Sequence, residues 1–126
     1  MAFRVSREEF ERLVEQALET LPDKYKGYFS NIAIMVEDYP SREDKEILTS
    51  KKDILLGLFR GTPYPGKGGF FEIPSPAPDK IALFQKNIET ICSTEEELIG
   101  QIQATLLHEV GHYFGISESD LRKYER

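Results

Sequence analysis

The chain has two histidines, His108 and His112, and their spacing is the feature that could carry chemistry. An α-helix makes one turn in about 3.6 residues, so both imidazoles would lie on one face and could bind one zinc ion at roughly 2.0–2.1 Å. Glu109 lies about 100° further round such a helix. It is poorly placed as a third ligand but well placed to reach a water molecule at the metal. In HExxH sites zinc acidifies that water and the glutamate takes its proton, so the spacing predicts a zinc site with Glu109 as the general base.

The alternative is a pair of surface histidines beside a solvated acid, because HExxH also arises by chance. On a helical wheel that starts at His108, the apolar positions fall between roughly 120° and 200° and comprise Ile99, Ile102, Leu106, Val110 and Tyr113. His112 lies at about 40°, away from this stripe, with Gln101 and Thr105 beside it. The other flank holds small residues that would let another backbone approach, namely Gly100, Ala104 and Gly111. The wheel favours the metal site and places Tyr113 in the core.

A catalytic zinc ion takes three protein ligands and keeps a fourth position open. Gly115 follows His112 closely and is expected to end the helix, so that the chain can turn back beneath the metal. The run HEVGHYFGISE, from His108 to Glu118, resembles the HExxHxxGxx pattern of metzincins and Asp-zincins, in which His or Asp follows three residues after the glycine. Over its whole length the chain resembles the small bacterial zincin-like metallopeptidases called minimal zincins. Residues 55–61, LLGLFRG, support this likeness more weakly.

The resemblance implies hydrolysis of a peptide bond in a peptide or protein substrate. Zn2+ would be held by His108, His112 and Glu118, while Glu109 would deprotonate the attacking water and pass the proton to the leaving amine. Glu118 is a departure, since the Asp-zincin pattern has aspartate at this position. Asp120 and water are the alternatives for the third ligand, and both acids could instead cap a short helix.

The resemblance also implies that an extended substrate pairs with a strand edge formed between Phe70 and Phe84. Met1 and Met35 both precede the motif, so the usual methionine turn after it is missing. Tyr124 could pack beneath the metal or donate to an oxyanion, although packing is the commoner role of a terminal tyrosine. Two other functions stay open. One is a metal-binding zincin-like domain without peptidase activity, acting as an interaction module; the other is a zinc hydrolase acting on RNA, which is less favoured because such enzymes use a third histidine.

The elements around the motif predict an α+β fold. Ser6-Arg7-Glu8-Glu9 is a capping box that opens a helix ending near Leu21-Pro22. Ser93-Thr94-Glu95-Glu96 is a second capping box and opens the motif helix, which is expected to reach about Phe114. Short apolar runs predict strands at 32–36, 54–59, 70–73 and 81–84, with a helical turn or two over 86–92. We therefore expect one zincin-like minimal domain over residues 1–126, with an N-terminal helix, a small mixed sheet of three to four strands, the HExxH helix and a short C-terminal helix.

Composition restricts the setting in which such a domain works. Of the 126 residues 40% are hydrophobic and 30% are charged, the balance of a soluble globular domain, and the formal net charge is −6. This charge and the scattered basic residues argue against a nucleic-acid partner, and no apolar run reaches the roughly 20 residues of a membrane span. The lone Cys92 suits a reducing compartment and is expected to be a small buried side chain. We therefore expect a bacterial, cytoplasmic protein with a peptide or protein substrate and no nucleic-acid or membrane partner; a homodimer is left open.

Overall fold

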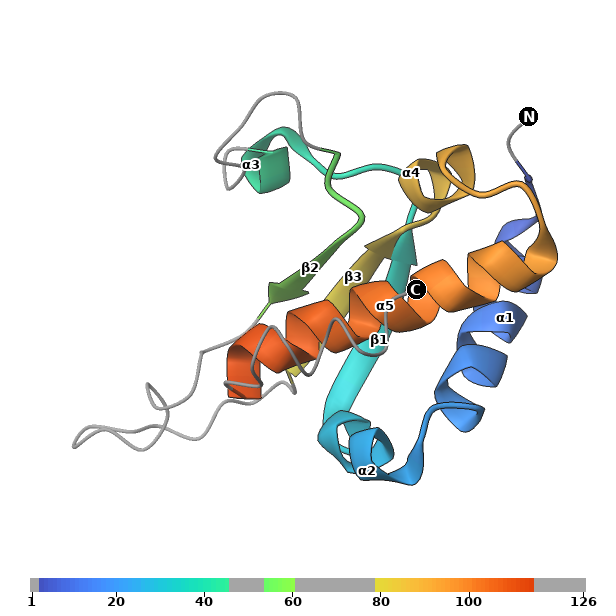
Figure 1. Ribbon diagram of the computed structural model, residues 1–126. Coiled ribbons are helices and arrows are strands. Elements are labelled where there is room, and N and C mark those ends of the chain that lie inside the picture. The colour runs from blue at the N-terminus through green and yellow to red at the C-terminus, as the bar shows by residue number, and fades with distance from the viewer. Residues whose placement is uncertain (1–2, 46–53, 61–78, 115–126) are drawn as a thin grey trace.

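The computed structural model describes residues 3–45, 54–60 and 79–114, and side chains up to residue 111 of the last range. Within these ranges the fold is α+β, as predicted: α5 lies across one face of a small mixed sheet, and α1 packs beside α5 (Figure 1). The elements are α1 (Arg7–Glu19), α2 (Asp23–Lys26), the 3-10 turn η1 (Gly27–Phe29), β1 (Ile32–Glu37), α3 (Arg42–Lys45), β2 (Gly57–Arg60), β3 (Asp79–Phe84), α4 (Gln85–Thr90) and α5 (Glu95–Phe114). The predicted strand at 70–73 and the short C-terminal helix lie outside the described residues.

Strand β3 lies at the centre of the sheet, whose strand order is β1-β3-β2. It runs parallel to β1, with Ile34 opposite Ile81, and antiparallel to β2, with Phe59 opposite Ile81. The last four residues of β3 are fully buried, which explains why they form a continuous apolar run. Because β3 has a neighbour on each side, the predicted substrate edge between Phe70 and Phe84 is wrong for residues 79–84. Residues 70–78 lie outside the described part of the chain.

The core lies between the sheet and the two long helices. The apolar face predicted for α1 is confirmed, since Phe10, Leu13 and Ala17 are fully buried. The α5 stripe is confirmed at its centre and is wider than expected, because this helix packs against α1 as well as against the sheet. Its buried apolar residues are Leu98, Ile102, Ala104, Leu106, Leu107 and Val110. No helix in the described ranges is both long and apolar enough to cross a membrane.

Both long helices begin with side-chain caps. In α1 the predicted capping residue is confirmed, since the Ser6 hydroxyl accepts the Glu9 N–H at 3.0 Å. In α5 the cap lies one residue later than predicted: the Thr94 hydroxyl accepts the Glu97 N–H at 3.1 Å, and Glu97 in turn accepts the Ser93 N–H at 2.7 Å. The sequence fits the Ser/Thr-x-x-Glu pattern in both registers, and the bond from the Leu98 N–H to the Thr94 carbonyl belongs to the later one.

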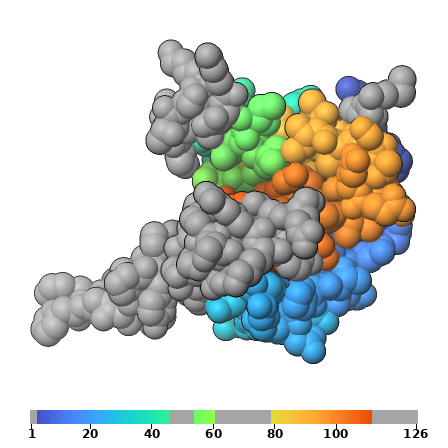
Figure 2. Space-filling view, viewed as in Figure 1, coloured from blue at the N-terminus to red at the C-terminus, as the bar shows by residue number. Residues whose placement is uncertain are grey.

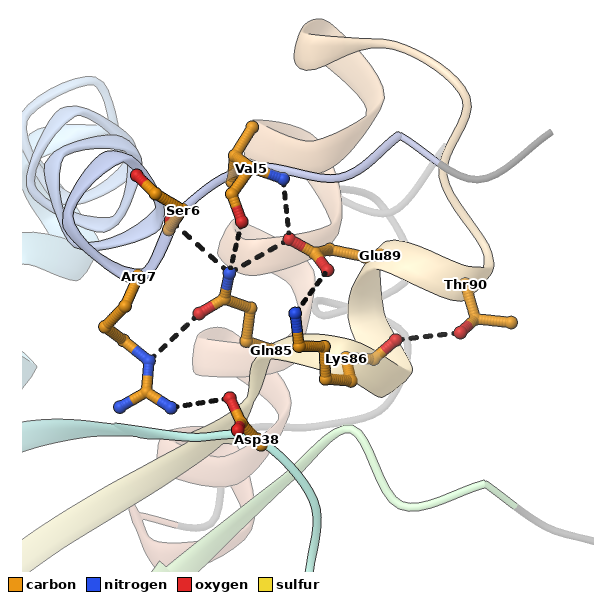
Figure 3. A network of polar contacts seen from close by, with 8 residues as sticks. All are labelled: Val5, Ser6, Arg7, Asp38, Gln85, Lys86, Glu89 and Thr90. Atoms are coloured by element: carbon orange, nitrogen blue, oxygen red, sulfur yellow. Dashed lines mark hydrogen bonds and ion pairs between the residues drawn. The ribbon is translucent and has the colours of Figure 1, made fainter.

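A buried polar network ties the segment before α1 to α4 (Figure 3). Glu89 is 1% exposed, and its Oε2 accepts the Val5 N–H and the Gln85 side-chain amide, each at 3.0 Å. The Gln85 amide oxygen accepts Nε of Arg7, whose guanidinium also binds Asp38 at the end of β1. The Phe3 N–H donates to the Cys92 carbonyl at 2.9 Å, and Cys92 is buried, as predicted. These bonds hold the N-terminal segment against the region where α4 leads into α5.

Candidate active site

Helix α5 carries the HExxH motif without interruption, since it runs from Glu95 to Phe114. His108 and His112 therefore lie one turn apart on a regular helix, as the zinc prediction requires. The side chains of His108 and Glu109 are partly buried. The side chain of His112 lies outside the described set, as do Glu118, Asp120 and Tyr124, so the assignment of these residues stays a prediction.

The described donors fit zinc in kind. Imidazoles four apart on a helix are a recurring zinc pair, and His108 is neither lost in the core nor fully exposed. Within the described residues no group of three histidine, cysteine, aspartate or glutamate side chains could hold a metal ion. This is the expected result when the second imidazole and the predicted third ligand both fall outside that set.

Glu109 makes a contact that the sequence did not predict. Its Oε1 accepts the main-chain N–H of Phe59 in β2 at 2.9 Å. The carboxylate proposed as the general base therefore bonds to a strand, although it stands on a helix. The two residues are 50 positions apart in the chain, so no local pattern reveals the bond.

The strand register explains why this N–H is available. The Phe84 N–H donates to the Leu56 carbonyl at 2.9 Å, which makes Leu56 and Phe84 a hydrogen-bonded pair of the antiparallel ladder. Such pairs alternate with pairs whose main-chain groups point away from each other. Phe59, opposite Ile81, belongs to the second kind. Its N–H consequently points to the side of β2 away from β3, and Glu109 meets it there.

Gly57 brings β2 close enough to α5 for this bond. A Cβ atom at Gly57 would lie 2.6 Å from Cγ2 of Thr105 and 3.1 Å from the Ala82 carbonyl oxygen. Thr105 is 6% exposed, so the side of α5 beside the histidines packs on β2. At Thr105 this side of α5 is therefore covered by β2 and is not exposed to solvent. A side chain at position 57 would require Thr105 or the elements themselves to shift, and close approach of this kind is a common reason for glycine within a strand.

Side chains and a neighbouring helix hold β2 at both ends. Just before the strand begins, the Asn87 side-chain amide donates to the Leu55 carbonyl at 2.9 Å, and the surfaces of β2 and α4 adjoin in Figure 2. At its end the Arg60 guanidinium binds both oxygens of Glu37, at 2.8 and 3.2 Å, and Asp44 at 3.0 Å. The backbone around Phe59 is thereby fixed relative to β1 and α3.

Asp44 is the most deeply buried member of this ion-pair cluster, at 7% exposed. Burial raises its pKa, but hydrogen bonds with the Ser41 main chain and side chain, together with the charge of Arg60, outweigh burial and hold the pKa below its ordinary value. Hydrogen bonding to Glu37 is the largest cause that raises the pKa of Arg60. Asp44 and Arg60 are therefore both charged at neutral pH.

The sequence held one signal for the role of β2. Gly57 interrupts an apolar run that otherwise predicts a strand, and an isolated glycine in a strand indicates a bulge or a close backbone approach. The partners of that approach, Thr105 and Glu109, could not be identified without the packing of α5 on the sheet. On the small-residue flank predicted to receive another backbone, a Cβ at Gly100 would have nothing within 4 Å, whereas the contact with β2 is made through Thr105.

Comparison with known proteins identifies a family and a likeness of fold. A family model described as zincin-like metallopeptidase matches residues 29–126. The structure is similar to that of a conserved hypothetical protein from Thermus thermophilus, with a TM-score of 0.57 and 20% identity over 87% of this chain and 94% of that chain. At this identity the likeness concerns the fold alone. No curated protein matches the sequence.

Proposed function

The chain belongs to the zincin-like metallopeptidase family, and from this premise we propose that it is a zinc-dependent peptidase with Glu109 as its general base. The observation that carries the proposal is the bond between Glu109 and Phe59. The Glu109 carboxylate lies at the outward side of β2, and this supports a role as base for an extended peptide bound along the sheet. A solvated surface acid would not be expected to make this contact.

His108 and His112 are the residues that would hold the zinc ion, with Glu118 as the third ligand in our proposal. A bound zinc ion supplies Lewis-acid chemistry, polarising a carbonyl and lowering the pKa of water to about 7. Imidazole nitrogens and a carboxylate are a common ligand set for zinc in hydrolases.

The protein's own residues then divide the remaining work. Glu109 takes the proton of the attacking water and delivers it to the amine that leaves. The Phe59 N–H on the outward side of β2 is taken by Glu109, so an extended peptide would pair with other main-chain groups along this side of the strand, which favours a peptide or protein substrate over a compact small molecule. The close packing of Gly57 on Thr105 keeps that strand beside the base.

The test compares wild-type protein with Glu109→Gln, both loaded with zinc, on a broad peptide library. We expect the variant to lose activity by about 100-fold or more, as is typical when a general base is removed. Zinc content measured by elemental analysis should stay equal in the two proteins. Indistinguishable rates would overturn the peptidase assignment and leave a metal-binding domain that acts as an interaction module.

The third ligand is tested separately through zinc affinity. Glu118→Ala should weaken zinc binding by about 10-fold or more, whereas Asp120→Ala, the matched control, should leave it within about twofold. The reverse result would assign the ligand to Asp120. Equal, unchanged affinities would assign the position to water.

A further inference from the structure

We propose that the main-chain N–H of Phe59 is a positioning donor for Glu109, so that the strand as well as the motif helix sets where the base lies. This inference rests on the proposed function in treating Glu109 as the base. The contact itself, Phe59 N–H to Glu109 Oε1 at 2.9 Å, can be examined without any assay of activity.

A helix alone does not fix a glutamate carboxylate. The side chain has three rotatable bonds, and holding it in one rotamer costs conformational entropy. A hydrogen bond from a backbone N–H to a carboxylate is charge-assisted and stronger than a neutral one. Because the donor belongs to the main chain of a paired strand, it cannot rotate away as a side-chain donor could.

The contacts beside this bond have the same spacing along α5 and along β2. Thr105 and Glu109 are four residues apart on α5, an axial rise of about 6 Å. Gly57 and Phe59 are two residues apart on β2, a rise of about 6.7 Å. Two successive contacts, Gly57 with Thr105 and Phe59 with Glu109, therefore fall in step along the helix and the strand.

Arg60 holds β2 in place from the opposite face of the sheet. Side chains alternate along β2, so Arg60 points to the sheet face opposite α5, where it binds Glu37 and Asp44. The residue next to the Phe59 donor is thus tied to β1 and α3. A shift of Phe59 away from Glu109 would strain these ion pairs, and a shift toward α5 would compress Gly57 against Thr105.

The contact is tested first by amide hydrogen exchange in protein free of metal. Glu109→Ala should speed exchange of the Phe59 amide by about 10-fold or more, while Glu109→Gln, which keeps an acceptor oxygen, should stay closer to wild type. The Leu58 amide, which faces β3, is the internal control. Glu96→Ala, which removes an exposed acid from the same helix, is the matched control variant. Unchanged exchange at Phe59 in Glu109→Ala would overturn the inference.

The role is tested second by a backbone ester. Replacing residue 59 with phenyllactic acid deletes its N–H and keeps its side chain, and kcat on a peptide found by the library screen should fall about 10-fold or more, with KM and zinc content within about twofold. The corresponding ester at Leu58 removes a ladder N–H and should lower stability without the loss of kcat. Equal losses of kcat in both esters would overturn positioning. If wild type cleaves nothing, the proposed function fails, and the exchange experiment still decides the contact.

Discussion

At the scale of single residues, Asp44 joins a short helix to the end of β2. Its carboxylate accepts the Ser41 N–H at 2.9 Å and binds Arg60 at 3.0 Å. Burial opposes the charge of this group, while Ser41 and Arg60 favour it, and the net effect lowers its pKa. A group of this kind links the stability of the fold to pH.

We predict that the protein loses stability on acidification partly through Asp44. Its pKa is lowered in the folded state, so its contribution is fully present above the unfolded value of about 3.9 and is lost as pH falls through the folded pKa. Urea unfolding measured between pH 7 and pH 2 should show this loss. Asp44→Asn should have a flatter profile below about pH 4, and an equally steep profile would contradict the prediction.

Residue spacing was sufficient to predict the motif but not its contacts. The HExxH spacing placed His108, Glu109 and His112 on a helix, because that inference needs only the helical repeat. It could not predict the Phe59 donor, since a bond across 50 residues depends on how α5 lies on the sheet. The assignment of Glu118 as a zinc ligand stays a prediction.

At the scale of elements, the sequence at the start of α5 fits two capping registers, one with Ser93 as the N-cap and one with Thr94. Thr94 caps the helix, while the Ser93 N–H is held by Glu97. Thr94→Ala should lower the free energy of unfolding by about 1 kcal/mol, because a helix N–H loses its acceptor. Ser93→Ala, one residue earlier, should change it by less than about 0.5 kcal/mol. Chemical denaturation of the two variants measures the difference, and a larger effect at Ser93 would favour the earlier register.

The packing of β2 on α5 gives a second prediction at this scale. Gly57→Ala should destabilise the fold by about 1–3 kcal/mol, because the new methyl group would lie 2.6 Å from Cγ2 of Thr105. Thr105→Ser removes that atom and keeps the hydroxyl, so the double variant should recover part of the loss. The contact with the Ala82 carbonyl remains at 3.1 Å, so recovery should be incomplete. Additive effects in a double-mutant cycle would contradict this account.

The apolar runs predicted the strands, but nothing in them predicted the strand order. The expected strand at 32–36 corresponds to β1, and those at 54–59 and 81–84 overlap β2 and β3. A hydrophobic pattern indicates which residues are buried but not which strands pair with each other. The central position of β3 was therefore missed. For the same reason, an edge role was wrongly given to residues 79–84.

At the scale of the whole molecule, α1 belongs to the core although it precedes the region matched by the family model, residues 29–126. Leu13 is fully buried in the same cluster as Ile102 and Leu106 of α5. The Gln103 side-chain amide also donates to the Ala17 carbonyl at 2.9 Å. The helix that carries the motif is thus supported by an element outside the matched region.

We therefore predict that damage to α1 destabilises the whole fold. Leu13→Ala should lower the free energy of unfolding by about 2–5 kcal/mol, whereas Glu15→Ala, on the exposed face of the same helix, should be nearly neutral. Circular dichroism and tyrosine fluorescence should report one shared transition, as the prediction of a single domain over residues 1–126 requires. Two separate transitions would contradict both expectations.

The rate at which the buried thiol of Cys92 reacts can report how often the N-terminal segment detaches from the fold. Burial, and then the charges of Glu97 and Glu89, raise the pKa of this thiol, so its reactive thiolate form is scarce in the folded protein. The Cys92 carbonyl also accepts the Phe3 N–H, which couples the thiol's surroundings to the first described residue of the chain. Alkylation should therefore wait for a local opening of this segment. Since the chain has one cysteine, the rate of its modification can be measured by mass spectrometry and reports the rate of that opening. Glu89→Gln should increase the labelling rate of Cys92. An unchanged labelling rate would show that the thiol is reached by another route.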